Sequence, residues 1–302
     1  MITFNLLKAI MLRSRWAIFF SLIVFAISPN VFSATENHRP YTLDRSEVID
    51  FHAKANSKDY EVYIKLPESY SNSPGKKYPL IVLTDGYYAF PLLSSINWRM
   101  SERNQVYEQS IIVGISYSKG DDISKSRAND FAPPASTDEK FKNKVDEAGR
   151  ADLYAKFLGQ ELLPYLVKSY SVDATRKIYA GHSYGGLLGT YILFTQPNMF
   201  DYYLIGSPSL WFNNKVMFNY EASYAKANKD LKAKVYMAAG SQEQNAQFGM
   251  VDYMMALDKQ LKARHYSQLT LVTETFPGEK HLSVYPTFIT RGLLWALPLK
   301  NE

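Results

Sequence analysis

The stretch from Lys177 to Gly186 constrains the fold of this 302-residue chain more than any other segment. It reads Lys-Ile-Tyr-Ala-Gly-His-Ser-Tyr-Gly-Gly, in which an apolar strand pattern leads into G-x-S-x-G and then into an apolar helix pattern. A serine in this pattern lies on a very sharp strand-to-helix turn, where the two glycines remove side chains that would collide. The pattern therefore predicts that Ser183 is an exposed nucleophile. The alternative is a glycine-rich turn in which Ser183 only caps the helix.

The rest of the chain alternates between strand and helix patterns. Strands are expected at residues 46–51, 60–66, 78–84, 111–116, 177–180, 203–205, 234–238 and 269–272. Helices are expected at 152–170, 185–194, 248–261 and 285–297, with Pro164 placed to kink the first. The apolar runs are typical of strands buried on both faces. The expected fold class is α/β, an α/β-hydrolase fold whose mostly parallel central sheet is flanked by helices on both faces.

Residues 118–145 lack this alternation. They are polar and contain Pro133-Pro134. A long segment of this kind in a compact domain is usually functional, so it predicts an irregular loop near the active face.

A serine nucleophile that attacks a carbonyl group needs two backbone N–H groups that stabilise the oxyanion. One is expected to be the amide of Tyr184, directly after the nucleophile. The second is expected in the loop after the third strand, where we favour the Tyr87 amide, with Gly86 as the alternative. The alternative is that Asp85-Gly86 forms a plain turn without a catalytic role.

Of the five histidines, only His281 follows the last expected strand and precedes the final helix. In this fold the order along the chain is serine, acid, histidine, so His38 and His52 come too early. His182 is adjacent to the serine in an extended stretch, so its side chain should point away from it. His265 falls at the end of a helix. His281 is therefore the predicted general base.

The acid is expected after the strand at 234–238. Glu243 is the only acidic residue of the loop that follows, and it would orient His281 and stabilise its protonated form. Asp252 is a less well placed alternative in the next helix. A Ser–His dyad without a working acid also stays open.

The N-terminal segment, residues 1–34, reads as a signal peptide. Lys8, Arg13 and Arg15 precede an apolar run of 12 residues at 16–27, and Ser33 offers a cleavage site. We therefore expect a signal peptide over 1–34, a single α/β-hydrolase domain over 35–302 and a periplasmic or secreted location. An uncleaved membrane anchor is the alternative, and Met11 is a second potential start.

Composition limits the other classes of function. The formal charge of +5 falls to about +2 without the three basic residues of the N-terminal segment, and no basic run or nucleic-acid motif is present. The chain has no cysteine, which excludes disulfides and Cys-based metal sites. A small-molecule ester is the expected partner.

With these residues in place, the chain resembles the putative esterase (esterase D-like) family of α/β-hydrolases, and within it the siderophore esterases that hydrolyse enterobactin and bacillibactin. Six stretches carry the resemblance in order, at residues 83–86, 126–133, 161–165, 180–187, 206–211 and 278–281. The resemblance implies a Ser/His-centred esterase without metal or organic cofactor, with an acid site at the position of Glu243. It implies a ferric catecholate siderophore as the substrate.

Two further residues are candidates for substrate binding. Arg127 would meet an anionic group, unless it pairs with Asp130 and only orders its loop. Trp211 would line the pocket or only pack against the sheet edge. Three alternative functions remain: a general esterase, an acyltransferase with the same triad, and a non-catalytic siderophore-binding protein.

Overall fold

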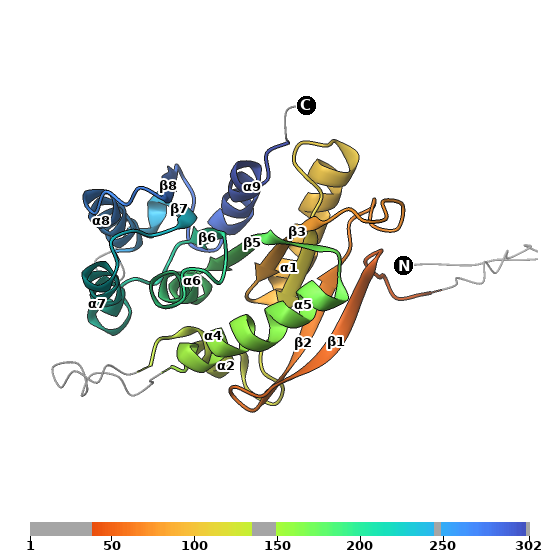
Figure 1. Ribbon diagram of the computed structural model, residues 1–302, viewed down its shortest axis with the longest axis horizontal. Coiled ribbons are helices and arrows are strands. Elements are labelled where there is room, and N and C mark those ends of the chain that lie inside the picture. Colours follow the sequence, from red (N-terminus) through yellow and green to blue (C-terminus); the bar gives the residue numbers. More distant parts are fainter. Residues whose placement is uncertain (1–37, 135–148, 245–248, 300–302) are drawn as a thin grey trace, which may run out of the picture. The chain divides into compact units, whose positions relative to one another are not determined.

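The computed structural model describes residues 38–134, 149–244 and 249–299, and the chain divides into two units after Tyr41. The second unit contains an eight-stranded sheet (Figure 1). Its strands are β1 (Ser46–Ala53), β2 (Lys58–Lys65), β3 (Tyr78–Leu83), β4 (Ile111–Ile115), β5 (Val172–His182), β6 (Tyr202–Gly206), β7 (Ala233–Gly240) and β8 (Leu269–Phe276).

The strand order is β1-β2-β4-β3-β5-β6-β7-β8. The pairs β1–β2 and β2–β4 are antiparallel, and all the others are parallel. Since each of the eight expected strand segments overlaps an observed strand, the predicted mostly parallel α/β sheet is confirmed.

The buried central strands face two cores. All six residues of β3 are buried, with Leu80 and Val82 packed into one apolar cluster and Ile81 and Leu83 into the other. This alternation follows from the two-residue period of a strand. The continuous apolar run in the sequence therefore indicates helices on both faces, as expected.

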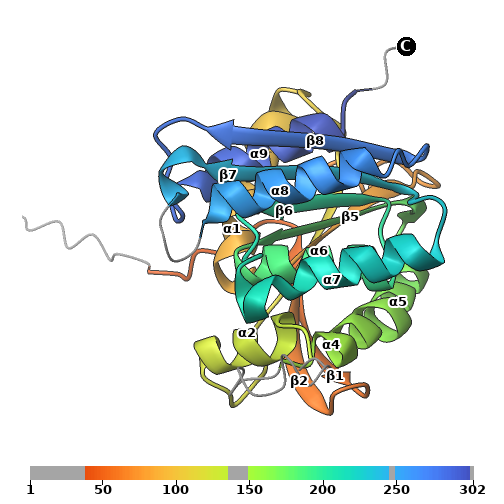
Figure 2. The same ribbon diagram turned by 90° about the vertical axis from the view of Figure 1, so that its left-hand side faces the viewer.

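Helices cover both faces of the sheet, and Figure 2 shows α8 lying along β7 and β8. Residues of α2 (Ile123–Phe131), α4 (Ala151–Phe157), α5 (Leu163–Ser169), α6 (Tyr184–Thr195), α7 (Phe212–Ala227) and α8 (Met250–Ala263) belong to the first cluster. Residues of α1 (Gly86–Asn97) and α9 (Val284–Ala296) belong to the second. Short helical turns occur at η1 (Trp98–Arg103), η2 (Leu158–Leu162) and η3 (Ser241–Glu243).

The helix expected at 152–170 is divided. The α-helices α4 and α5 are joined by η2, which is a π-helical turn. Pro164 lies in the first turn of α5, where its missing N–H is tolerated. A change of helical pitch just before Pro164 therefore takes the place of the expected kink.

The expectation of an irregular loop at 118–145 is wrong for its first half. Residues 123–131 form α2, which begins where the Asp122 side chain accepts hydrogen bonds from the amides of Ser124 and Lys125, at 2.9 and 3.3 Å. This N-cap stabilises a helix whose polar composition gives little periodic signal. Residues 135–148 lie outside the described residues.

The predictions for the N-terminal segment also lie outside the described part of the chain. Within residues 38–134, 149–244 and 249–299, no helix is long and apolar enough to cross a membrane.

Candidate active site

Ser183 lies on the strand-to-helix turn that the sequence predicts. β5 ends at His182, α6 begins at Tyr184, and Ser183 between them has φ 61° and ψ −117°. Such a backbone conformation is costly for a residue with a side chain, and strain of this kind concentrates at functional sites.

The two flanking glycines are required by close packing. A Cβ at position 181 would lie 2.5 Å from the Gly185 carbonyl oxygen, and a Cβ at position 185 would lie 2.3 Å from Thr84 Oγ1. Both distances are too short for real contacts. The tight turn therefore depends on glycine at these two positions.

Ser183, His281 and Glu243 lie in one hydrogen-bonded row. His281 Nε2 is 3.0 Å from Ser183 Oγ, and His281 Nδ1 is 2.6 Å from Glu243 Oε2. The three residues follow β5, β8 and β7, respectively. Because the carboxyl ends of parallel strands meet at one sheet edge, residues separated by up to 98 positions converge there.

Glu243 is buried, and its side chain is 1% exposed. Its Oε1 accepts hydrogen bonds from Ser207 Oγ at 2.7 Å and from the Gly240 amide at 2.6 Å. Burial acts to raise the pKa of Glu243, but the hydrogen bonds from His281, Ser207 and Gly240 outweigh it and hold the pKa below its usual value. The Glu243 carboxylate is therefore ionised where it contacts Nδ1 of His281.

The alternative acid, Asp252, has other partners. Its side chain and its amide both contact the Gln244 side chain.

The ionised Glu243 also fixes the tautomer of His281. A carboxylate only accepts hydrogen bonds, so Nδ1 of His281 carries the hydrogen. The bare Nε2 then accepts from the Ser183 hydroxyl. The geometry is that of a general base directed at a nucleophile.

The expected oxyanion donors lie at two helix N-termini near the nucleophile turn. Tyr184 is the first residue of α6, and Gly86 and Tyr87 are the first two residues of α1. The amides in the first turn of a helix point outward from its N-terminus. A Cβ at Gly86 would lie 2.7 Å from the Ile115 amide nitrogen, so the start of α1 packs directly on β4.

His182 packs next to the site, a contact that the sequence does not predict. His182 is 4% exposed, and the ring centroids of His182 and His281 lie 4.6 Å apart. Burial first, and then the charge of His281, lower the pKa of His182 to about 3. The alternation of a strand turns His182 away from Ser183, but no pattern in the sequence shows that it then packs on the loop from the last strand.

Arg127 lies near the site but has a different partner from the one considered. Its Nε and Nη2 donate to the Asp85 carboxylate at 2.6 and 3.1 Å. Asp130 instead accepts from Lys58 at 3.3 Å and from the Tyr60 hydroxyl at 2.9 Å. Pairing of Arg127 with Asp130 was therefore the wrong expectation. Asp130 faces β2 because α2 forms in place of the expected loop.

Trp211 is partly buried just before α7. Its ring packs edge-on against Tyr184 at a centroid distance of 6.2 Å. This contact places the indole beside the residue that follows the predicted nucleophile. The role of Trp211 in substrate binding stays a prediction.

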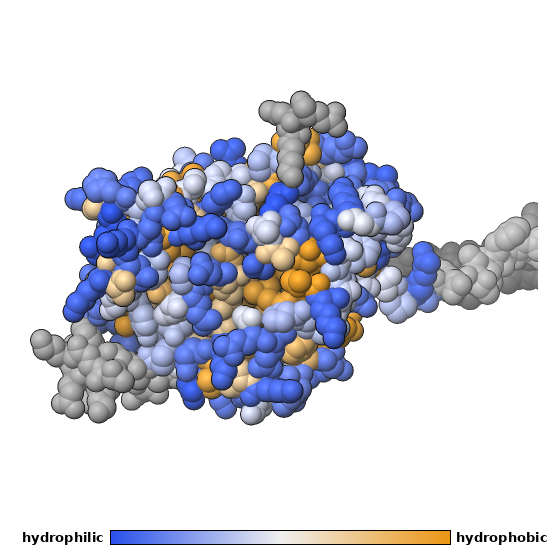
Figure 3. Space-filling view, viewed as in Figure 1, coloured by the Kyte–Doolittle hydropathy of each residue, from blue (hydrophilic) through white to orange (hydrophobic). Residues whose placement is uncertain are grey.

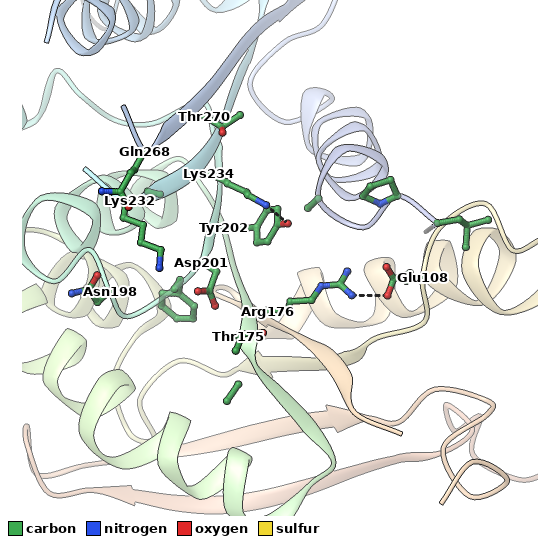
Figure 4. A pocket seen from close by; sticks show the side chains of 16 residues that line it. Glu108, Thr175, Arg176, Asn198, Asp201, Tyr202, Lys232, Lys234, Gln268 and Thr270 are labelled. Carbon is green, nitrogen blue, oxygen red and sulfur yellow. Dashed lines mark hydrogen bonds and ion pairs between the residues drawn. The ribbon is translucent and has the colours of Figure 1, made fainter. Parts of the chain in front are cut away.

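A separate cavity of about 840 Å³ lies at the opposite, amino-terminal edge of the central strands. Figure 4 shows the ion pair between Arg176 and Glu108 at 2.6 Å, and the Lys234 ammonium at 2.8 Å from the Tyr202 hydroxyl. None of the predicted site residues lines this cavity.

The face in Figure 3 is mostly hydrophilic, with a hydrophobic area near its centre.

Within the described residues, no group of three or more His, Cys, Asp or Glu side chains is arranged to hold a metal ion.

The fold and this row of side chains define an α/β-hydrolase with a serine, a histidine and a glutamate in hydrogen-bonding contact. The family described as "Putative esterase" matches residues 53–283. The chain belongs to this family and is a carboxylic ester hydrolase.

Several relatives are similar to most of the chain. The ferri-bacillibactin esterase BesA of Bacillus subtilis is 29% identical over 268 residues, which cover 85% of this chain and 91% of BesA. A siderophore triacetylfusarinine C esterase of Aspergillus fumigatus is 27% identical and covers 71% of this chain and 80% of its own length.

Solved structures share the fold. The BES protein from Bacillus cereus superposes with a TM-score of 0.74 at 27% identity, covering 87% of this chain and 98% of that structure. The siderophore hydrolase EstB from Aspergillus nidulans superposes with a TM-score of 0.75 at 23% identity, over 88% of this chain and 99% of that structure.

Proposed function

We propose that this protein is a serine esterase that hydrolyses the ester bonds of a siderophore through Ser183, His281 and Glu243. The observation that carries the proposal is the hydrogen-bonded row from Ser183 Oγ to Glu243 Oε2, at 3.0 and 2.6 Å. Acyl transfer through a serine needs a base within hydrogen-bonding distance of the hydroxyl and a group that orients the base.

The proposed reaction has two halves. Ser183 Oγ attacks the ester carbonyl carbon while its proton passes to His281 Nε2. The protonated imidazole then gives that proton to the departing alkoxide, which leaves an acyl-enzyme. In the second half, water attacks the acyl-enzyme, His281 takes a proton from the water, and Ser183 recovers its hydrogen as the acid leaves.

Glu243 acts on the imidazole rather than on the substrate. It holds the Nδ1–H tautomer and stabilises the positive charge that His281 carries in each half-reaction. The hydrogen bonds from Ser207 and Gly240 keep the carboxylate in place without neutralising it.

The oxyanion of each tetrahedral intermediate is assigned to the amides of Tyr184 and Tyr87, with Gly86 as the alternative to Tyr87. Both amides belong to helix N-termini, where the backbone dipoles favour negative charge. Removing one such donor typically costs about 10²–10³ in kcat.

The proposed substrate class rests on the relatives, whose names include a ferri-bacillibactin esterase and a siderophore enterobactin esterase. We assign a ferric catecholate trilactone as the substrate, which would need repeated cleavage to open the ring and cut the linear products.

The substrate test compares ferric and iron-free enterobactin with p-nitrophenyl butyrate, using mass spectrometry of the products. The expected result is linear catecholate fragments with wild type, none with Ser183→Ala, and full activity in the control Ser124→Ala on α2. Unchanged trilactone together with fast butyrate turnover would indicate a general esterase. Ester products that appear only when an alcohol acceptor is added would indicate an acyltransferase.

We also propose that residues 1–34 direct the protein to the periplasm or the exterior. The test is to express the full chain in a Gram-negative host and to measure the mass of the protein in each cell fraction. A periplasmic protein that begins after Ser33 is expected. Full-length protein in the membrane fraction would instead support an anchor.

A further inference from the structure

One side chain, Arg127, contacts both segments to which the oxyanion donors are assigned. It projects from α2 and forms a two-pronged ion pair with Asp85, at 2.6 and 3.1 Å. Its guanidinium also lies over the Tyr184 ring, 5.8 Å from the centroid. Asp85 directly precedes α1, and Tyr184 directly follows the nucleophile.

Asp85 is held in an unfavourable backbone conformation. Its φ of 55° and ψ of 40° are left-handed, which a residue with a Cβ adopts at a cost of about 1–2 kcal/mol. Its amide and carbonyl set the direction in which Gly86 and Tyr87 leave β3. An interaction that fixes the Asp85 side chain therefore also fixes the start of α1.

The Asp85 carboxylate is enclosed. Its side chain is 2% exposed and that of Arg127 is 22% exposed. A Cβ at Gly185 would lie 3.5 Å from Asp85 Oδ2, so the carboxylate also borders the turn that holds Ser183. A buried carboxylate without its cation is costly, and Arg127 supplies that cation.

The helix that presents Arg127 is itself fixed. Asp130, on the same helix, is buried and accepts hydrogen bonds from Lys58 and from the Tyr60 hydroxyl, both on β2. The helix therefore cannot shift easily. The guanidinium has a defined position relative to the sheet.

We infer that Arg127 is a positioning residue that holds the two assigned oxyanion donors in register through Asp85 and Tyr184, rather than an anchor for an anionic substrate. The inference rests on the proposed function, since it needs oxyanion chemistry at Ser183. The Arg127 charge is already matched by the Asp85 carboxylate. This leaves little net attraction for a second anion.

The two roles predict opposite kinetics for neutral and anionic esters. A positioning residue acts on the transition state, so its loss lowers kcat for every ester and leaves KM nearly unchanged. An anchor for substrate anions acts on binding, so its loss raises KM for anionic esters alone. A matched pair of substrates, p-nitrophenyl butyrate and p-nitrophenyl hemisuccinate, separates the two.

The experiment measures kcat and KM of wild type, Arg127→Met, Arg127→Lys and Asp85→Asn on both esters, with Lys125→Met as the control on an exposed position of the same helix. We expect Arg127→Met to lose roughly 10–100-fold in kcat on both esters, with KM within about threefold. Arg127→Lys should retain an intermediate kcat because it keeps the charge but not the two-pronged geometry. The double variant Asp85→Asn/Arg127→Met should lose no more of its kcat than the more damaging of the two single variants does.

A second readout does not depend on the choice of ester. The rate constant for labelling Ser183 with a fluorophosphonate should fall in Arg127→Met by about the same factor as kcat, while near-UV circular dichroism stays that of wild type. An unchanged kcat on the neutral ester, or a rise in KM confined to the hemisuccinate, would overturn the inference. Failure of the proposed function looks different, because wild type itself would then show no hydrolysis that depends on Ser183.

Discussion

His182 and His281 lie with their rings in contact, their centroids 4.6 Å apart and their planes inclined by 37°. The two residues come from β5 and from the loop after β8, which are separated in the sheet by β6 and β7. Tyr285 from α9 meets the His182 ring edge-on at 5.6 Å. The loop that carries His281 therefore rests on a buried imidazole.

The buried His182 should make folding stability depend on pH. Its pKa is about 3 in the folded protein, against 6.5 as the ordinary value. Between these values the unfolded chain binds a proton that the folded chain does not, so the free energy of unfolding falls as the pH falls, by up to about 1.4 kcal/mol per pH unit. Besides burial, the charges of His281, Glu243 and Arg127 act on the pKa of His182. The lowered pKa of Glu243 places the effect of Glu243 on stability toward the acid end of this pH range.

Urea unfolding at about pH 7.5 and about pH 5 checks this prediction. Wild type should lose about 2 kcal/mol more between these pH values than His182→Gln does. An equal loss in both proteins would show that His182 does not remain neutral on folding.

Replacing Glu243 by glutamine should lower kcat and leave KM nearly unchanged. The amide can still accept hydrogen bonds, but it does not stabilise the protonated His281 and does not fix its tautomer, so a loss of about 10²–10⁴ is expected. Steady-state kinetics on p-nitrophenyl butyrate measure it, with Asp252→Asn as the control acid. If Glu243→Gln stays within threefold of wild type, the enzyme works as a Ser–His dyad.

Replacing Gly181 by alanine should destabilise the fold as well as the site. The added Cβ would lie 2.5 Å from the Gly185 carbonyl oxygen, which belongs to the backbone and cannot move without opening the turn. We expect a loss of about 1–3 kcal/mol in the free energy of unfolding, together with a strong loss of activity.

The matched control for this substitution is Gly159→Ala. There the nearest neighbours of the new Cβ would be the ends of two flexible side chains, Met199 Cε at 3.0 Å and Gln196 Oε1 at 3.6 Å. Urea unfolding should show little change for this variant. Similar losses in the two variants would contradict the account of the turn.

The strands and the contact of Ser183, His281 and Glu243 were predictable, because each follows from a general rule of the fold. A six-residue apolar run such as 78–83 indicates a strand buried on both faces, and the carboxyl ends of parallel strands then bring Ser183, Glu243 and His281 together. Helix α2 was missed because its stability depends on the Asp122 cap and on Asp130 contacts with β2, and neither gives a periodic pattern.

Two contacts near the site could not be predicted from the sequence. The partner of Arg127 is Asp85, 42 residues earlier, and this pairing depends on where α2 packs relative to the residues that follow β3. The contact of His182 with His281 depends on the path of the loop after β8. Both are tertiary contacts, and the local sequence pattern of each segment does not indicate which other segment it will contact.

The most direct test of the central claim is the site and extent of labelling by a fluorophosphonate, read by peptide mass spectrometry beside the residual hydrolysis of p-nitrophenyl butyrate. We predict one adduct per chain on Ser183, loss of hydrolysis in proportion to labelling, and neither labelling nor hydrolysis in Ser183→Ala. Hydrolysis that persists in folded Ser183→Ala, or an inactivating adduct on another residue, would contradict it.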